Sequence, residues 1–202
     1  MAEPLDTLLL ELEEFGKSND ASTSERPRRM LNITRDTGEF LAVLVQATLA
    51  RRVLEIGTSN GYSTLWLARA ARAIGGSVST VELSDYKIGL ARATFARSGL
   101  AGFISLVQAD AGQVLRGSAD GAFDLIFLDS DRPEYPGWWP DLRSRAPAGR
   151  APGCRQRDVT PSRDGAVRRA GDCRCSIHDQ PRSRGERGVP RRQVFMTRSD
   201  PT

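Results

Sequence analysis

The chain has 202 residues, of which 27% are charged, and a formal net charge of +4. This length fits one domain of ordinary size. An uninterrupted apolar run of the roughly 18 residues that a membrane-spanning helix needs does not occur, and the acidic N-terminal stretch does not resemble a signal peptide, so we expect a cytoplasmic protein without membrane partners.

The charge is distributed unevenly along the chain. Residues 1–142 contain 14 Lys and Arg against 19 Asp and Glu, whereas residues 143–202 contain 15 Arg and only 6 acids. All 20 leucines lie at or before Leu142, and all three cysteines and the single histidine follow it. We therefore expect N-terminal helices over residues 1–50, a globular core over 51–142, and an Arg-rich tail over 143–202 whose composition favours disorder.

Two amphipathic helices are predicted before the core, over residues 4–17 and 36–49, with residues 18–29 as a loop between them. Asp36 is the expected cap of the second helix. The side chains expected to face inward are Leu5, Leu8, Leu9 and Leu12 in the first helix and Phe40, Leu41, Leu44 and Val45 in the second.

From residue 52 onward, short apolar runs alternate with helical segments. Strands are predicted over 52–56, 77–83, 103–108 and 123–129, with helices over 63–74 and 85–98 and a short helix near Gln113. This alternation predicts an α/β fold with a parallel sheet covered by helices on both faces. Ligands of such sheets bind at the carboxyl ends of the strands, so the candidate site residues are those that follow each strand.

The first strand is followed by a glycine-containing turn in the sequence VLEIGTSNGYSTLWLA, residues 53–68. Gly57 and Gly61 allow a sharp turn and close approach to a ligand, and Ser63 is a candidate cap for the next helix. The spacing fits neither the dinucleotide fingerprint nor a phosphate loop. A carboxylate at Glu55 suits a ligand with a cationic end, and the alternative is a glycine turn that binds nothing.

The pattern V-L-E-I-G-T-x-x-G-Y-S-T is similar to the first motif of the catechol and caffeoyl-coenzyme A O-methyltransferases, which are class I S-adenosylmethionine-dependent enzymes. The resemblance implies a Rossmann-like methyltransferase sheet and places the cofactor's methionine portion near Glu55, Gly57, Thr58 and Ser63. It also implies that Glu82 accepts the ribose hydroxyls and that Asp110 and Ala111 pack on the adenine. The alternatives are a solvated acid at Glu82 and a plain helix cap at Asp110.

The fourth strand and its continuation, FDLIFLDSDRPEYPGWW over residues 123–139, resemble the family's F-D-x-x-F-x-D-x-D-K-x-x-Y. Asp129 then corresponds to an acid that binds Mg²⁺ or a similar cation, which would position a substrate hydroxyl and lower its pKa. Arg132 replaces the family's lysine and is a poor general base, so the catalytic residue is left open. Trp138 and Trp139 either wall an aromatic substrate or pack the following helix on the sheet.

The tail lacks the Asp-Asn pair that completes the metal site in the family. Codons can be chosen for residues 151–161 that, read one base later, give LLVVDNVTSH, which contains an apolar strand and Asp-Asn. We therefore hypothesise a one-base frameshift close to Arg143, with a natural Arg-rich tail as the alternative. The sheet is then expected to stop at its fourth strand and leave that strand as an exposed apolar edge. The spacing of Cys154, Cys173, Cys175 and His178 does not match a zinc finger.

The function expected from the resemblance is S-adenosylmethionine-dependent O-methylation of a small hydroxylated molecule, by an active or a decayed enzyme. Relatives often dimerise, so a homodimer is also expected. Two alternatives stay open: cofactor binding without catalysis, and nucleic-acid binding by the Arg-rich tail. The tail contains no lysine and almost no aromatic residue for base stacking, which argues against nucleic acid.

Overall fold

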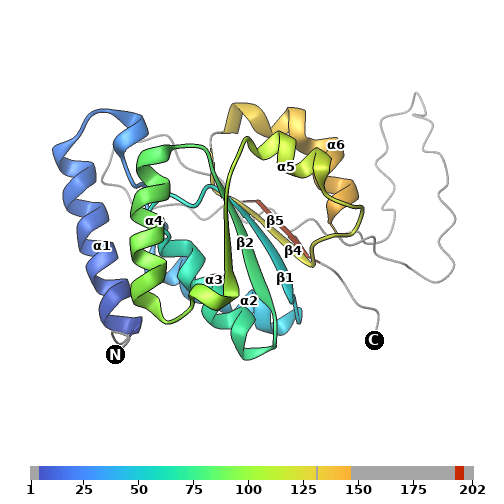
Figure 1. The fold of residues 1–202 in the computed structure, drawn as a ribbon, viewed down its shortest axis with the longest axis horizontal. Coiled ribbons are helices and arrows are strands. Elements are labelled where there is room, and N and C mark those ends of the chain that lie inside the picture. The colour runs from blue at the N-terminus through green and yellow to red at the C-terminus, as the bar shows by residue number, and fades with distance from the viewer. Residues whose placement is uncertain (1–4, 131, 147–193, 198–202) are drawn as a thin grey trace, which may run out of the picture.

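The computed structural model describes residues 5–130, 132–146 and 194–197. A five-stranded sheet with the order β3-β2-β1-β4-β5 forms its centre (Figure 1). The first four strands are parallel, as the alternating sequence pattern predicts, and they span Arg52–Ile56 (β1), Ser77–Glu82 (β2), Ile104–Gln108 (β3) and Leu125–Leu128 (β4). The predicted Rossmann-like α/β class is therefore confirmed.

Six α-helices surround the sheet in the part of the chain that the structure describes: α1 (Leu5–Ser22), α2 (Arg35–Ala47), α3 (Tyr62–Ala73), α4 (Asp85–Ser98), α5 (Ala111–Gly117) and α6 (Tyr135–Arg145). Three short 3₁₀ turns accompany them, η1 (Arg26–Arg28), η2 (Ala101–Phe103) and η3 (Arg132–Glu134). The predicted loop over residues 18–29 is shorter than expected, because α1 continues to Ser22.

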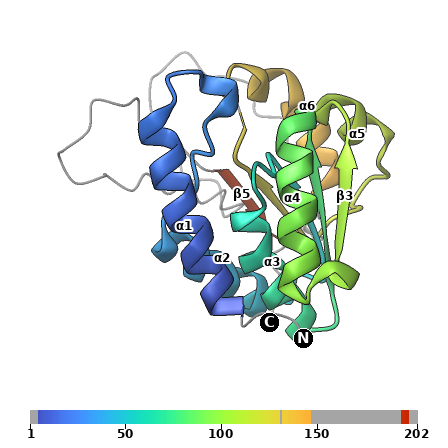
Figure 2. The same ribbon diagram turned by 60° about the vertical axis from the view of Figure 1, so that its left-hand side comes forward.

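Each face of the sheet has its own hydrophobic core, because successive strand residues point to opposite faces. Helices α1 to α4 cover the face that carries Val53 and Phe127, and Figure 2 shows α1 and α4 side by side there. Helices α5 and α6 cover the face that carries Leu54 and Ile126. Burying both faces of β4 explains why its sequence, LIFL, is a continuous apolar run.

Two predicted helix starts are wrong. The cap of α2 is Thr34, whose hydroxyl accepts from the Thr37 N–H, and not Asp36. Helix α3 begins after Gly61, and the Ser63 hydroxyl is used elsewhere, as described below. Thr34 and Asp36 both have capping ability and stand two residues apart, whereas Ser63 uses its hydroxyl in a tertiary contact with Glu55.

The inward face of α2 is also narrower than predicted. Leu41 and Val45 are fully buried and Leu44 is partly buried, but 44% of Phe40 is exposed. Phe40 therefore lies on the outer face, whereas all four leucines predicted for α1 belong to the core or pack against it.

The fourth strand is not an exposed edge, contrary to prediction. Residues Val194–Thr197 form β5, which pairs antiparallel with β4. An apolar edge strand presents a row of unpaired backbone N–H and C=O groups, and any extended segment of the same chain can satisfy them. Disorder was expected over residues 143–202, but α6 continues to Arg145 and residues Val194–Thr197 form β5, so the expectation is wrong for these two parts. Residues 147–193, with the proposed out-of-frame strand near 151–161, lie outside the described residues.

Within the described residues, the longest helices are too short or too polar to cross a membrane.

Candidate functional site

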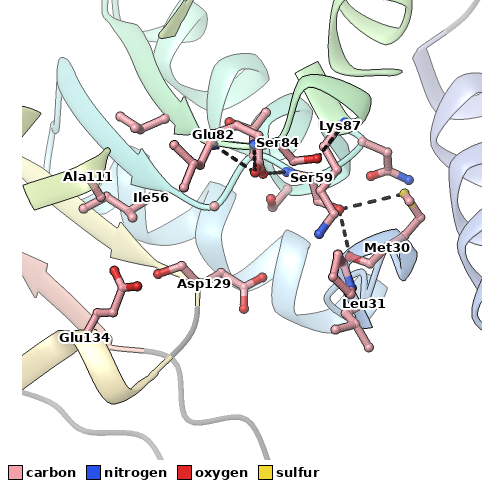
Figure 3. Close-up of a pocket in the computed structure, with 18 of the residues that line it drawn as sticks. Met30, Leu31, Ile56, Ser59, Glu82, Ser84, Lys87, Ala111, Asp129 and Glu134 are labelled. Carbon is pink, nitrogen blue, oxygen red and sulfur yellow. Dashed lines mark hydrogen bonds between the residues drawn. The ribbon is translucent and has the colours of Figure 1, made fainter. Parts of the chain in front are cut away.

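A cavity of about 390 Å³ opens at the carboxyl ends of the four parallel strands. The loops after β1, β2, β3 and β4 form its walls, together with the segment between α1 and α2 (Figure 3). Its size lies in the range of small-molecule sites. Seven of the eight predicted cofactor-binding residues line this cavity, and the exception is Glu55. The seven are Gly57, Thr58, Ser63, Glu82, Asp110, Ala111 and Asp129.

The turn after β1 depends on its two glycines. Gly57 has a φ of +105°, and a Cβ at that position would lie 2.5 Å from the carbonyl oxygen of Asp129. Gly61 has a φ of +89°, and its Cβ would meet the Phe95 ring at 2.6 Å. Both positions therefore need glycine for conformation and for space. The turn is held tightly against the end of β4 and against α4.

The backbone amides of this turn are largely occupied by protein acceptors. The Gly57 and Thr58 N–H groups donate to the Val81 carbonyl, the latter at 3.3 Å, and the Gly61 N–H donates to the Thr58 carbonyl. The Ser59 N–H donates to the Glu82 carboxylate at 2.9 Å. A phosphate loop needs several amides free for the ligand, so the geometry agrees with the absence of a phosphate-binding motif.

Glu55 lies beneath the cavity and does not line it. Its position in β1 points its side chain to the face that α3 covers, where it is fully buried. The carboxylate accepts hydrogen bonds from Ser63 Oγ at 2.6 Å, from Thr80 Oγ1 at 2.6 Å and from the Thr64 hydroxyl. Burial raises the pKa of Glu55 from 4.5 to about 7, and these hydrogen bonds limit the rise.

Glu82 ends β2 and is held in place by three backbone N–H groups. Its Oε1 accepts from Leu83 and Ser84 at 3.0 Å each, and its Oε2 accepts from Ser59 at 2.9 Å. Figure 3 shows the carboxylate at the cavity wall beside Ser59 and Ser84. Each carboxylate oxygen has about two lone-pair sites, so Oε2 keeps one acceptor site for a ligand hydroxyl.

The residues that follow β3, together with the end of β1, supply another part of the cavity wall. Asp110 caps α5, since its Oδ1 accepts from the Gln113 N–H at 2.9 Å, and it lines the cavity as well. Ala111 and Ile56 add apolar surface next to it. An apolar strip beside an acid suits the flat ring of a purine nucleoside.

Asp129 lines the cavity opposite Glu82 (Figure 3). Among the described residues, no three His, Cys, Asp or Glu side chains gather so as to hold a metal ion. A cation at Asp129 stays a prediction. The Arg132 side chain, Asp131 and the predicted Asp-Asn partner lie outside the described residues.

The sequence does not reveal the wall contributed by residues 26–33. Asp20 in α1 accepts from the N–H groups of Met30 and Leu31 at 2.6 and 2.8 Å, and Ser59 Oγ donates to the Met30 carbonyl at 2.8 Å. Leu31 adopts a φ of +52°, which is unusual for a side chain with a Cβ. These contacts hold Met30, Leu31 and Ile33 against the cavity.

Two further lining residues come from the turn and from α6. Asn60 is 1% exposed, its Oδ1 accepts from the Tyr62 N–H, and its Nδ2 has no partner among the described residues. A buried donor without a partner is costly, so Asn60 is suited to a ligand acceptor. Trp138 packs in the core between α6 and the sheet and reaches the cavity, whereas 39% of Trp139 is exposed.

Comparison with known proteins agrees with this geometry. A sequence model of a family described as O-methyltransferase matches residues 8–144. Over 112 residues the chain is 40% identical to a catechol O-methyltransferase of Mycobacterium tuberculosis, a match that covers 55% of this chain and 50% of the relative. It is 32% identical to a catechol O-methyltransferase of Niastella koreensis over 56% of this chain and 52% of that protein. The chain thus spans about half the length of these curated relatives.

Solved structures with the same fold include methyltransferases with bound cofactor. The O-methyltransferase from Bacillus cereus in complex with SAH superposes with a TM-score of 0.59 at 31% identity, covering 72% of this chain and 64% of that one. The O-methyltransferase TomG from Streptomyces achromogenes, solved in complex with SAM, has a TM-score of 0.57 at 28% identity, covering 74% and 63%.

Proposed function

The chain belongs to the O-methyltransferase family, and from this premise we propose that its cavity binds S-adenosylmethionine and serves methyl transfer to a hydroxyl group of a small molecule. The observation that carries the proposal is the convergence of the four strand ends on one cavity. Along its wall lie the Glu82 carboxylate, an apolar strip formed by Ile56 and Ala111, and the glycine turn from Gly57 to Ser63.

The cavity fits this cofactor in size and in chemistry. Glu82 is held by three backbone N–H groups, and its Oε2 keeps an acceptor site for a ribose hydroxyl, as acids in this position do in dinucleotide folds. Ala111 and Ile56 offer apolar surface to the adenine, next to Asp110. At the other end the turn from Gly57 to Ser63 receives the methionine portion, where the unpartnered Asn60 Nδ2 can donate to its carboxylate.

Methyl transfer depends mainly on how the cofactor and the acceptor oxygen are oriented toward each other. Bound S-adenosylmethionine supplies an electrophilic methyl group to an acceptor oxygen. The chain contributes the rigid wall that fixes the cofactor and excludes water, formed by Met30, Leu31 and Trp138 on the open side. We assign no residue as the general base. The acceptor, a small hydroxylated compound, and a divalent cation at Asp129 are parts of the proposal, as are a homodimer and a cytoplasmic location.

The experiment is a calorimetric titration of the full chain with S-adenosylhomocysteine, comparing wild type with Glu82→Gln and Asp85→Asn. The Glu82 variant keeps its shape but loses the charge that accepts the ribose hydroxyls, so we expect its affinity to fall roughly 10- to 100-fold. Asp85 lies three residues further on, at the start of α4, and does not line the cavity, so Asp85→Asn should bind like wild type.

Equal affinities of wild type and Glu82→Gln would contradict the assigned ribose contact. Binding without any methyl transfer to catechol-like acceptors would instead support a cofactor-binding protein without catalysis.

A further inference from the structure

The wall of residues 26–33, called the flap from here on, is held over the cavity by individual side chains. It lies between α1 and α2 and contains a single 3₁₀ turn, η1. It contributes no strand to the sheet, although Met30, Leu31 and Ile33 line the cavity. Segments without a ladder of backbone hydrogen bonds open more readily than the elements around them. The position of the flap therefore depends on a few contacts that can be tested one by one.

Asp20, near the end of α1, holds the flap from the side of that helix. Its Oδ1 accepts from the Met30 N–H at 2.6 Å, and its Oδ2 accepts from the Leu31 N–H at 2.8 Å. Hydrogen bonds from backbone N–H groups to a carboxylate are stronger than those between neutral groups. Helix α1 is itself fixed, because Leu8 and Leu9 are fully buried in the core. Asp20 is thus a stationary anchor for the flap.

Ser59 holds the flap from the side of the cavity. Its Oγ donates to the Met30 carbonyl at 2.8 Å, and Figure 3 shows the two residues side by side. The peptide unit between Met30 and Leu31 is therefore bound at both ends, by Ser59 at its carbonyl oxygen and by Asp20 at its N–H. The Ser59 N–H donates to Glu82 Oε2 at 2.9 Å, which connects the flap with the acid proposed to accept a ribose hydroxyl.

The two contacts hold the flap against an unfavourable backbone conformation. Leu31 and Ser59 each have a φ of +52°, in the left-handed region that a residue with a Cβ rarely adopts. Such conformations cost energy and persist only where the surrounding contacts impose them. Opening of the flap would release the strain at Leu31 at the cost of the hydrogen bonds to Asp20 and Ser59. Loss of either contact should therefore favour the open flap.

Resting on the proposed function, we propose that the flap is a gate for the cofactor and that Asp20 is the positioning residue that keeps it shut. Asp20 does not line the cavity and acts through the peptide unit between Met30 and Leu31. The cofactor enters and leaves while this peptide is released, and it is retained while the peptide is held. Weakening the contact speeds association and dissociation together. The Kd, which is their ratio, changes little as long as the flap stays mostly closed.

The test measures the binding kinetics of S-adenosylhomocysteine to the full chain by stopped flow, for wild type, Asp20→Asn and Asp6→Asn. Trp138 lines the cavity and supplies the fluorescence signal. In Asp20→Asn an amide donor replaces one acceptor oxygen, so one hydrogen bond to the flap is lost. We expect the association and dissociation rates both to rise roughly tenfold, while the Kd changes by less than about threefold. Asp6→Asn makes the same change on the same helix, where the side chain is 77% exposed and pairs with Arg69, so its rates should match wild type.

Hydrogen exchange of the ligand-free chain tests the contact without the cofactor. Asp20→Asn should speed the exchange of the amides of residues 30–33 roughly tenfold and leave those of residues 8–12 in α1 unchanged. A general loss of stability would speed the exchange of both groups of amides. If Asp20→Asn does not fold, Ser59→Ala removes the other contact with the flap and should raise the exchange of residues 30–33 and the dissociation rate of the ligand.

Faster dissociation at an unchanged association rate would overturn the inference, because the flap would then contact the ligand without controlling its entry. Equal exchange of the amides of residues 30–33 in wild type and Asp20→Asn would overturn it as well. A failure of the proposed function looks different, since wild type would then not bind S-adenosylhomocysteine at all, whatever the hydrogen exchange of the flap.

Discussion

At Gly57 both the backbone conformation and the neighbouring backbone atoms oppose the addition of a single methyl group. Its φ of +105° disfavours any residue with a Cβ, and the added atom would lie 2.5 Å from the carbonyl oxygen of Asp129, which is backbone and cannot rotate away. The close approach joins the ends of β1 and β4, so the shape of the cavity depends on it.

For Gly57→Ala we expect a loss of about 2 to 4 kcal/mol in the free energy of unfolding, measured with urea. The matched control is Gly75→Ala, where φ is +71° but no described atom lies within 4 Å of the added Cβ. That variant carries the conformational cost alone, about 1 kcal/mol. Equal losses in the two variants would show that the contact with Asp129 is unimportant.

Glu55 makes stability depend on pH. Its pKa is raised by burial from 4.5 in the unfolded chain to about 7 in the fold, so the folded state binds the proton more tightly. Stability must then fall as the pH rises through the window between these two values, because the native state there releases a proton that the unfolded state has already lost.

Between pH 5 and pH 8 we expect the free energy of unfolding of wild type to fall by about 2 to 3 kcal/mol more than that of Glu55→Gln, because the glutamine cannot titrate. Urea unfolding of both proteins at the two pH values measures this difference, since all other titrating groups are common to both. An equal fall in the free energy of unfolding of wild type and Glu55→Gln would contradict the raised pKa of Glu55.

At the scale of elements, α6 is fixed to the sheet mainly by one side of the helix. Trp138 is 8% exposed and packs with Leu142 in the core against β4, while 39% of Trp139 is exposed. Tyr135 anchors the start of α6, as its hydroxyl donates to the Ser130 carbonyl at 3.0 Å. The helix therefore also holds the loop that follows β4 at the cavity.

Trp138→Ala should lower the free energy of unfolding by about 3 kcal/mol, because it leaves a large void between helix and sheet. Trp139→Ala, one residue further along the same helix, should change it by less than about 1 kcal/mol. Thermal or urea unfolding of the two variants checks the prediction. A larger effect at Trp139 would mean that α6 faces the sheet differently.

The elements also show what the sequence can and cannot reveal. The strands are predicted within a few residues because buried parallel strands are short apolar runs between helical segments. Helix starts are predicted less well, since Thr34 and Asp36 are both good caps and stand only two residues apart, and the structure uses Thr34, whose hydroxyl accepts from the Thr37 N–H. The pairing of β5 with β4 joins segments some seventy residues apart, and no local pattern reveals it.

The same distinction applies to the site. Glu82, Asp110 and Asp129 could be predicted because strand ends converge in this type of sheet. Glu55 was expected to line the cavity, but the alternation of side chains along β1 turns it under α3. The wall around Met30 depends on Asp20, ten residues earlier, and such a long-range hydrogen bond leaves no sequence signature.

At the scale of the whole molecule, the change in composition after Leu142 coincides with the end of the family match at residue 144. This coincidence supports the proposed frameshift near Arg143. Resequencing the gene tests it directly. We expect a single-base difference there that restores an apolar strand followed by Asp-Asn, and an unambiguous reading of the present frame would exclude the proposal.

The central claim is that the cavity at the carboxyl ends of β1 to β4 holds S-adenosylmethionine. The most direct measurement is a crystal structure of the full chain grown with saturating S-adenosylhomocysteine. We predict the ribose hydroxyls within hydrogen-bonding distance of Glu82 and the amino-acid end against the turn from Gly57 to Ser63. S-adenosylhomocysteine bound elsewhere on the chain, or an empty cavity at saturating ligand, would contradict the account.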